Sequence, residues 1–184
     1  RTDTGIEQRV HPTMVPLDSV IAQVDGVTNA VALESDILGE LLMVGPGAGG
    51  NATASAVLGD ITDIAKSRPG AQQVPVLGRP ATLLEPYRQA QMRSHEGGYF
   101  IRLTVVDRTG VFASIAAKMA DNAISLESIV QRSEHAAAEA PVTIILVTHA
   151  TMEDAVRKAV AAIKGEGYLV GEPQVIRIER PKVA

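Results

Sequence analysis

The sequence predicts an α+β protein whose two halves are organised differently. In the first half, apolar strands lead into a glycine loop and an amphipathic helix, which indicates part of an α/β region. In the second half, the apolar periodicity predicts the order βαββαβ. The chain has 184 residues, 46% of them hydrophobic, which suffices for one large or two small domains with real cores.

Composition limits the classes of partner and site. Seventeen basic against twenty-one acidic residues, and only five aromatic ones, argue against a nucleic-acid surface. No apolar run approaches the roughly 20 residues of a membrane helix, and no signal segment opens the chain, so we expect a cytoplasmic protein without a membrane partner. Without cysteine there are no thiolate ligands, and the four histidines lack ligand spacing, so no metal site is expected: His11, His95, His135 and His149.

The first half begins with an alternating segment that predicts a strand over Ile6–Val10. The opening residues look cut out of a longer protein. A turn or short helix should follow over 12–20, and then a hairpin-like pair, Ala30–Leu33 with Gly39–Val44. Beyond the glycine loop, a helix is expected to lay one apolar stripe against a sheet and to stop near 67–70; the stripe is Val57, Leu58, Ile61, Ile64 and Ala65.

The glycine loop spans 45–50, with glycine at 45, 47, 49 and 50. Glycines let a ligand approach the backbone closely, and the free amides of a helix start favour an anionic or polar group. The alternative is that the loop binds no ligand and is a tight strand-to-helix turn capped by Asn51 or Thr53. No Lys-Ser or Lys-Thr follows, which excludes a P-loop, and no βαβ unit with a following acidic residue indicates the primary dinucleotide fingerprint.

A linker is predicted over 69–97, where Pro, Gly, Gln and charged residues replace any sustained period. Two apolar patches within it, 74–77 and 83–87, could dock as a short strand and a turn. This segment separates a first domain over 1–68 from a second over 98–180.

The second half contains four predicted strands, over 99–106, 124–130, 142–148 and 175–178, with a polar loop over 133–140. One helix should run from Val111 to Asp121–Asn122, and another should be capped by Thr151 and closed by Gly165–Gly167. This order makes a ferredoxin-like sheet with both helices on one face. Because its edges and open face need cover, we expect a homo-oligomer, most simply a dimer, joined through the sheet or the helices.

The second half resembles an ACT domain, through Asp107-Arg108-Thr109-Gly110-Val111 and Asn122-Ala123-Ile124-Ser125-Leu126. Such domains bind amino acids and regulate the enzymes that carry them, although many only dimerise. The resemblance implies effector contacts at Asp107, Thr109, Gly110, Val111, Asn122 and Ile124. Gly110 would let the backbone turn tightly and expose amides to a carboxylate, while Asp107 would meet an ammonium group.

The first half resembles the C-terminal part of the catalytic region of homoserine dehydrogenases. The similar segments are Val10-His11-Pro12-Thr13, 26–31 (Gly-Val-Thr-Asn-Ala-Val) and 45–60, which begins Gly-Pro-Gly-Ala-Gly-Gly-Asn-Ala-Thr-Ala. In that family the glycine loop lies against the nicotinamide end of NAD or NADP, which implies cofactor contacts at Gly45, Gly47 and Gly49.

The resemblance also implies what the chain lacks. The Rossmann fingerprint, the catalytic lysine and most homoserine-binding carboxylates of the family lie upstream of the matched segment, so no catalytic residue is assigned here and the chain alone should be inactive. The leading hypothesis is a C-terminal piece of an NAD(P)-dependent homoserine dehydrogenase with an amino-acid-sensing ACT domain, its effector being threonine. The alternatives are a stand-alone amino-acid-binding module and a purely structural dimerisation domain.

Overall fold

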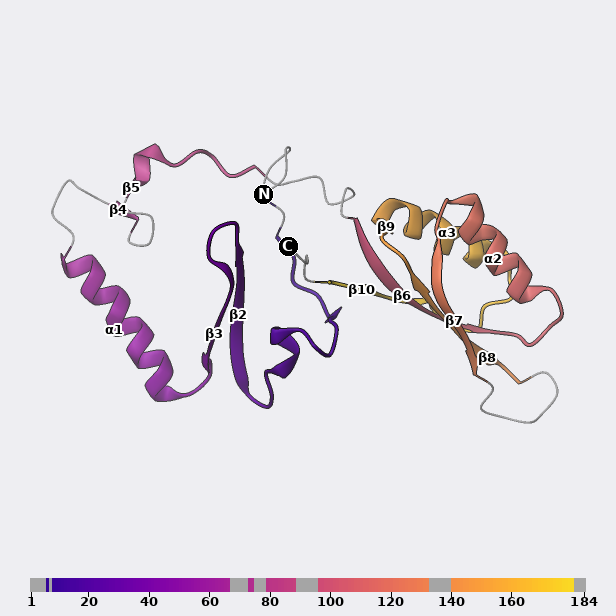
Figure 1. Cartoon of the computed structure of the whole chain (residues 1–184), viewed down its shortest axis with the longest axis horizontal. Helices are drawn as coiled ribbons and strands as arrows, with labels where there is room; N and C mark the ends of the chain where they lie inside the picture. Colours follow the sequence, from indigo (N-terminus) through magenta and orange to yellow (C-terminus); the bar gives the residue numbers. More distant parts are fainter. Residues whose placement is uncertain are drawn as a thin grey trace. The chain divides into compact units, whose positions relative to one another are not determined.

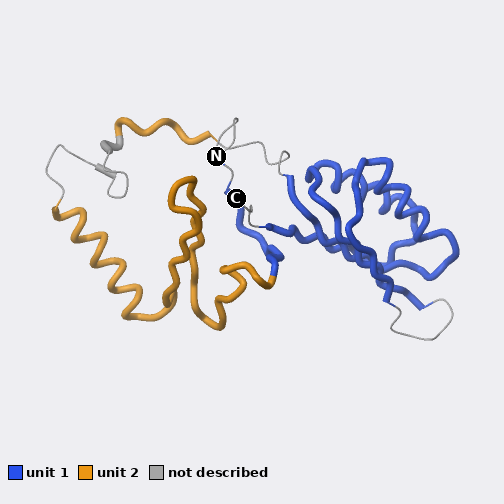
Figure 2. The backbone as a smooth tube through the Cα atoms, viewed as in Figure 1, with its two compact units in different colours: residues 1–16, 89–184 blue, residues 17–88 orange. Residues whose placement is uncertain are grey.

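The computed structural model describes residues 6, 8–66, 73–74, 79–88, 96–132 and 140–180. The chain divides into two compact units (Figure 2). Unit 1 comprises Arg1–Pro16 and Gln89–Ala184, and unit 2 comprises Leu17–Arg88. The first sixteen residues therefore join the second half of the chain in one unit. The family domains expected over 1–68 and 98–180 remain predictions, because a division by compactness does not test them.

Unit 1 contains the predicted βαββαβ order, so the α+β class is confirmed (Figure 1). The six elements are β6 (Glu96–Val105), α2 (Val111–Asp121), β7 (Leu126–Arg132), β8 (Val142–Thr148), α3 (Glu153–Gly165) and β10 (Gln174–Ile178). Their antiparallel sheet has the strand order β10-β6-β8-β7, which is the ferredoxin-like order.

Two further short strands extend this sheet. The first, β1 (Thr13–Met14), runs parallel to β10 at the sheet edge, with Thr13 opposite Arg177, and the backbone N–H of Glu179 donates to the Met14 carbonyl at 2.9 Å. The second, β9 (Thr151–Met152), pairs with the first two residues of β6. The start of the chain is thus bonded into the sheet of unit 1.

The core of unit 1 lies between the sheet and its two helices, which cover the same face (Figure 1). Alternation places every second residue of β6 and β8 inward, so Ile101, Leu103 and Leu146 are fully buried. The helices add residues at intervals of three or four, Val111, Ile115 and Met119 from α2 and Val156, Ala159 and Ile163 from α3. Tyr99, Ile101, Leu103 and Val105, which alternate along β6, are all buried on this inward face.

In unit 1, one predicted strand start is shifted, one predicted helix cap is wrong and one predicted loop is almost wholly outside the described residues. Strand β6 begins at Glu96, inside the predicted linker, because β9 supplies hydrogen-bonding partners there. The predicted Thr151 cap is wrong: Thr151 lies in β9, the N-cap position of α3 is Met152, and no side chain caps that helix. The polar loop expected over 133–140 lies outside the described residues except for Ala140.

Unit 2 is built on a hairpin and a helix (Figure 1). Strands β2 (Thr28–Ser35) and β3 (Gly39–Pro46) pair along their full lengths, which confirms the predicted hairpin. The short helix η1 (Val20–Gln23) precedes them, and α1 (Gly50–Lys66) follows the glycine loop. In the linker, β4 (Gln73–Val74) pairs with β5 (Arg79–Pro80) and is followed by η2 (Ala81–Leu83).

Two expectations for the first half are wrong. Residues 8–10 form no strand, and the first strand lies instead at Thr13–Met14, because its partner is the distant β10. Helix α1 has its predicted apolar stripe, but no residue of α1 is buried; Ile61 is 54% and Ile64 73% exposed. The hairpin is also open, with Val31 and Met43 each about half exposed.

Candidate functional site

The glycine loop joins the end of β3 to the start of α1. Gly45 lies in β3 opposite Asn29 of β2, and the chain then turns through Gly47 and Gly49 into α1. Gly49 has φ +122°, a backbone conformation that residues with a Cβ rarely adopt. Its carbonyl accepts the backbone N–H of Thr53 at 3.0 Å, so the loop closes directly onto the first helical turn.

Gly47 lies directly against the side chain of Asn29. A Cβ placed on Gly47 would lie 1.9 Å from Nδ2 of Asn29 and 2.6 Å from its Cγ, far inside any real contact. The carboxamide of Asn29 therefore occupies the space that a side chain at 47 would need. Asn29 lies in the similar segment 26–31, but no local sequence pattern marks it as a site residue, because its contact with Gly47 forms only when the hairpin and the following turn come together.

The other side of the loop is open and electrostatically suited to a polar ligand. A Cβ on Gly45 or Gly49 would meet nothing within 4 Å in the described structure. The first turn of α1 contains no acidic residue, so the positive end of its dipole is not neutralised by the helix itself. The loop therefore leaves space for the close approach of a ligand at Gly45 and Gly49, and the assignment of Gly45, Gly47 and Gly49 to a cofactor site remains a prediction.

The predicted effector residues divide into two groups at opposite ends of α2. Asp107, Thr109 and Gly110 form an exposed turn after β6, which we call the effector turn, and Gly110 has φ +91° immediately before Val111. The 11 residues of α2 separate this turn from Asn122, a distance of about 16 Å along the helix. One copy of the chain thus does not bring all six residues together.

Asn122 and Ile124 instead terminate α2. The N–H of Ile124 donates to the carbonyl of Met119 and that of Ala123 to Ala120, both at 2.9 Å, and Ala123 has φ 55°. This is the hydrogen-bond pattern of a Schellman motif with a left-handed residue after the helix. The side chain of Ile124 is buried in the core, while the Nδ2 of Asn122 donates to the carbonyl of Lys118 at 2.9 Å. Val111 is likewise a core residue.

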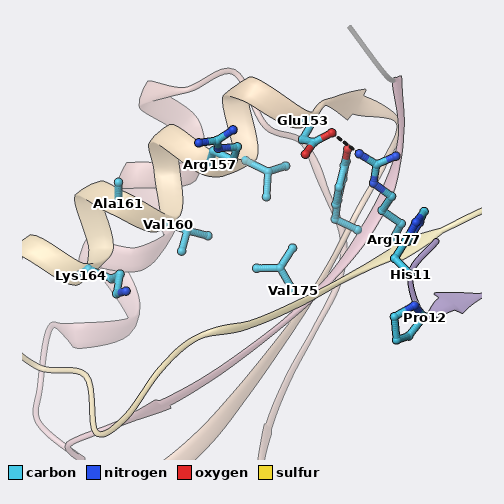
Figure 3. Close-up of a pocket in the computed structure, with 11 residues that line it drawn as sticks. His11, Pro12, Glu153, Arg157, Val160, Ala161, Lys164, Val175 and Arg177 are labelled. Carbon is cyan, nitrogen blue, oxygen red and sulfur yellow. Dashed lines mark hydrogen bonds and ion pairs between the residues drawn. The ribbon is translucent and has the colours of Figure 1, made fainter. Parts of the chain in front are cut away.

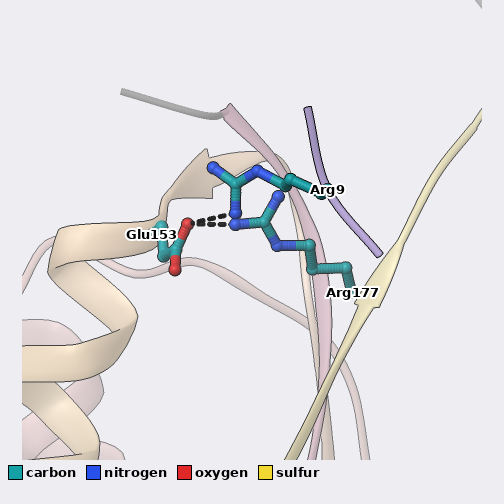
Figure 4. Close-up of polar contacts among 3 residues, drawn as sticks. All are labelled: Arg9, Glu153 and Arg177. Carbon is teal, nitrogen blue, oxygen red and sulfur yellow. Dashed lines mark hydrogen bonds and ion pairs between the residues drawn. The ribbon is translucent and has the colours of Figure 1, made fainter. Parts of the chain in front are cut away.

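A cluster of charges ties the start of the chain to α3 (Figure 4). The guanidinium groups of Arg9 and Arg177 both bind Oε2 of Glu153, the Arg9 contact being 2.9 Å long. The Arg177 side chain is 8% exposed and Glu153 24%, so the cluster is largely removed from water. Glu153 is the first residue of α3, where a carboxylate also interacts favourably with the helix dipole.

Two classes of site have no support in the part of the chain that the structure describes. No group of three or more histidine, aspartate or glutamate residues there is arranged to hold a metal ion. No described helix is both long and apolar enough to cross a membrane.

Sequence comparison gives two family matches. Residues 2–62 match the model described as homoserine dehydrogenase, and residues 99–167 match the ACT domain. The first match contains the glycine loop and Asn29, and the second contains the effector turn, α2 and all of α3.

Curated relatives and a solved structure extend this similarity over nearly the whole chain. A homoserine dehydrogenase of Pseudomonas aeruginosa is 35% identical over 98% of the chain, and one of Neisseria gonorrhoeae is 36% identical over 97%. A homoserine dehydrogenase structure from Thiobacillus denitrificans is 36% identical with a TM-score of 0.81 and also covers 98% of the chain. The chain spans 42%, 41% and 40% of these three proteins, respectively. The chain therefore combines a segment similar to homoserine dehydrogenases with a following ACT domain.

Proposed function

We propose that this chain is the C-terminal portion of a cytoplasmic NAD(P)-dependent homoserine dehydrogenase, which interconverts L-homoserine and L-aspartate 4-semialdehyde in the biosynthesis of threonine, methionine and isoleucine. The observation that carries the proposal is the glycine loop, open at Gly45 and Gly49 and packed against Asn29 at Gly47. This loop lies within the segment that matches homoserine dehydrogenases.

In this proposal the loop forms the nicotinamide-side wall of the cofactor site. Bound NAD or NADP supplies or accepts the hydride. Gly45, Gly47 and Gly49 hold the cofactor by letting its ring come close to the backbone, and Asn29 fixes the position of the loop from behind. Catalysis also requires a proton relay and substrate carboxylate contacts, which we assign to the region of the family that precedes this segment. The 184-residue chain alone is therefore inactive.

The exposed apolar residues of unit 2 support the proposal that this chain is only part of a larger enzyme. Large apolar residues of the α1 stripe and of the hairpin are at least half exposed, among them Met43, Ile61 and Ile64, and proteins normally cover such residues when they gather on one surface. We infer that the remainder of the dehydrogenase covers these apolar residues. The chain spans only 40–42% of the length of its relatives, so most of such a protein lies outside this segment.

The test compares the full-length protein carrying this chain with the 184-residue chain alone. NADPH oxidation with L-aspartate 4-semialdehyde is followed at 340 nm in both. Activity in the full-length protein and none in the chain alone is the expected result. An inactive but folded full-length protein contradicts the proposal.

For regulation, we propose that the ACT domain binds threonine at the effector turn. Asp107 accepts the ammonium group, and backbone amides around Thr109 and Gly110 donate to the carboxylate. If Asn122 and the residues after it also contact this ligand, they come from a second copy of the chain, because α2 separates them from the turn by about 16 Å. Regulation and oligomerisation are then linked.

The alternative is a stand-alone amino-acid-binding or dimerisation module without catalysis. The core of unit 1 favours it, because the helix-covered face of its sheet is buried by residues of that unit alone. Calorimetric titration of the 184-residue chain with threonine separates the candidates when combined with the activity assay. Tight threonine binding with an inactive full-length protein favours the module, and no binding of any amino acid favours a dimerisation role.

A further inference from the structure

A pocket of about 390 Å³ lies beside α3 within unit 1 (Figure 3). One side is formed by α3, from Glu153 to Lys164, and the other by Val175 and Arg177 of β10. His11 and Pro12, just before β1, and Tyr99 of β6 complete the lining. The volume is within the range of about 300–1,000 Å³ that small-molecule sites occupy. None of the six predicted effector residues lines this pocket.

The middle of the pocket is apolar. Val160 of α3 and Val175 of β10 point toward each other across it (Figure 3). Val156 is fully buried beneath them, whereas Val175 is 43% exposed and Val160 is half-buried. An aliphatic group of three or four carbons placed between these side chains would remove them from water, at roughly 25 cal/mol per Å² of apolar surface buried.

Two opposite charges stand one helical turn apart at the edge of this apolar region. Both arginines that bind Glu153 use Oε2, and among the described residues Oε1 of Glu153 accepts no hydrogen bond. Arg157, four residues along α3, forms no ion pair within the described part of the chain, unlike Lys164, which binds Glu172 at 2.5 Å. Residues at this spacing lie on the same face of a helix. Considering only the residues that the structure describes, the pocket therefore offers one carboxylate oxygen and one guanidinium without partners beside an apolar wall.

We propose that this pocket binds a small aliphatic α-amino acid as a zwitterion. Its ammonium group donates to Oε1 of Glu153, its carboxylate accepts from Arg157, and its side chain lies between Val160 and Val175. Arg9 and Arg177 hold Glu153 in place through its other oxygen. The site is separate from the effector turn, and the proposal does not depend on dehydrogenase activity.

The ligand class is tested by calorimetric titration of the 184-residue chain with three matched probes. L-leucine carries both charges, 4-methylpentanoate only the carboxylate and 3-methylbutylamine only the ammonium group. We expect L-leucine to bind, and each single-charge probe to bind at least about tenfold more weakly, because one charged group of the pocket is then left without its partner. A single-charge probe that binds as tightly as L-leucine overturns the zwitterion assignment. The assignment is also overturned if none of leucine, isoleucine and valine binds.

The position of the site is tested with neighbouring variants of equal charge change. Arg157→Gln should weaken leucine binding at least about tenfold, and Ala161→Phe should block the pocket from its rim. Lys158→Gln is the matched control, because Lys158 binds Asp154 at 2.9 Å and does not line the pocket. Both substituted positions on the pocket rim are exposed, and a thermal melt verifies the fold of each variant.

A variant of the effector turn distinguishes this proposal from the threonine proposal. Asp107→Asn should leave leucine affinity within twofold of the original chain, whatever it does to threonine binding. Loss of leucine binding in Asp107→Asn with retention in Arg157→Gln overturns the pocket next to α3. Loss in Arg157→Gln alone supports it, even if no threonine site exists at the turn.

Discussion

The contact between Gly47 and Asn29 can be tested by substituting each residue alone and both together. In Gly47→Ala the new Cβ lies 1.9 Å from Nδ2 of Asn29, about 1.5 Å short of an ordinary contact, so one of the two groups must move. The group that moves is the carboxamide, because it is the end of a flexible and exposed side chain. A displaced rotamer costs about 0.5–1.5 kcal/mol, so the protein stays folded while the rear support of the loop is lost.

The assay is steady-state kinetics of the full-length protein with NADPH and L-aspartate 4-semialdehyde. Gly47→Ala should raise KM for NADPH about tenfold or more, which corresponds to about 1.4 kcal/mol of cofactor binding. Combining it with Asn29→Ala removes the clash, so the double variant should return to the KM of Asn29→Ala alone. The coupling between the two positions is then non-additive, as expected of residues in contact.

Gly59→Ala is the matched control. Gly59 lies inside α1 with open space around its Cα, so alanine there should leave KM unchanged and stabilise the helix by up to about 1 kcal/mol. An unchanged KM in Gly47→Ala refutes the role of the loop in cofactor binding. A KM in the double variant well above that of Asn29→Ala alone refutes the positioning role of Asn29 and leaves direct contact of the cofactor with Gly47 as the cause.

Three further predictions concern unit 1. Gly110→Val should weaken threonine binding in calorimetry by straining the effector turn, whereas Gly171→Val, which replaces a glycine of the same φ (+91°) elsewhere, should not; equal losses would show a general folding defect. Ala123→Gly should raise the free energy of unfolding by about 1 kcal/mol, since glycine takes the left-handed conformation after α2 without strain, and a lower melting temperature would contradict this. The hydrogen bond and charge of Glu166 raise the pKa of Lys118 above its ordinary 10.5. The stabilisation lost in Lys118→Met should therefore be the same at pH 7 and 9, and it should shrink only as the pH rises past 10.5. A difference between pH 7 and 9 in urea titrations would refute this assignment.

The elements of the chain that local periodicity determines were predictable. The alternation of Tyr99, Ile101, Leu103 and Val105 identified β6 because its two faces differ, one against the core and one toward the outside. The hairpin of β2 and β3 was predictable for a related reason, since its strands are neighbours in sequence and their pairing needs only a short turn. The order βαββαβ then determined the sheet topology.

Pairings between distant segments were not predictable in the same way. Strand β1 has only two residues, and its partner β10 is about 160 residues further along the chain, so no local pattern distinguishes it from the alternating segment before it. Thr151 is a good N-cap residue by type, yet it lies in β9, where its backbone pairs with Gly97 of β6. The helix begins only after Met152. In both places tertiary hydrogen bonds outweigh a local preference.

The candidate sites divide along the same line. The glycines at 45, 47 and 49 were predictable because their residue type already implies a close approach. Asn29 and the pocket beside α3 were not, because each depends on side chains that the fold brings together from separate segments: Asn29 with Gly47, and Glu153 with Arg9 and Arg177.

The ion cluster has a structural consequence for regulation. Residues 2–62 match homoserine dehydrogenase, yet Arg9, Thr13 and Met14 are bonded to α3 and β10 of the ACT unit. The polypeptide leaves this sheet at Pro16 and enters unit 2 at residue 17. We therefore expect a ligand that shifts α3 against β10 to act on the strand edge and the carboxylate that hold Arg9 and β1, which lie in the segment matching homoserine dehydrogenase. Any coupling free energy between the two matched segments would then be carried by β1, which lies in the first segment, and by Glu153, which lies in the second.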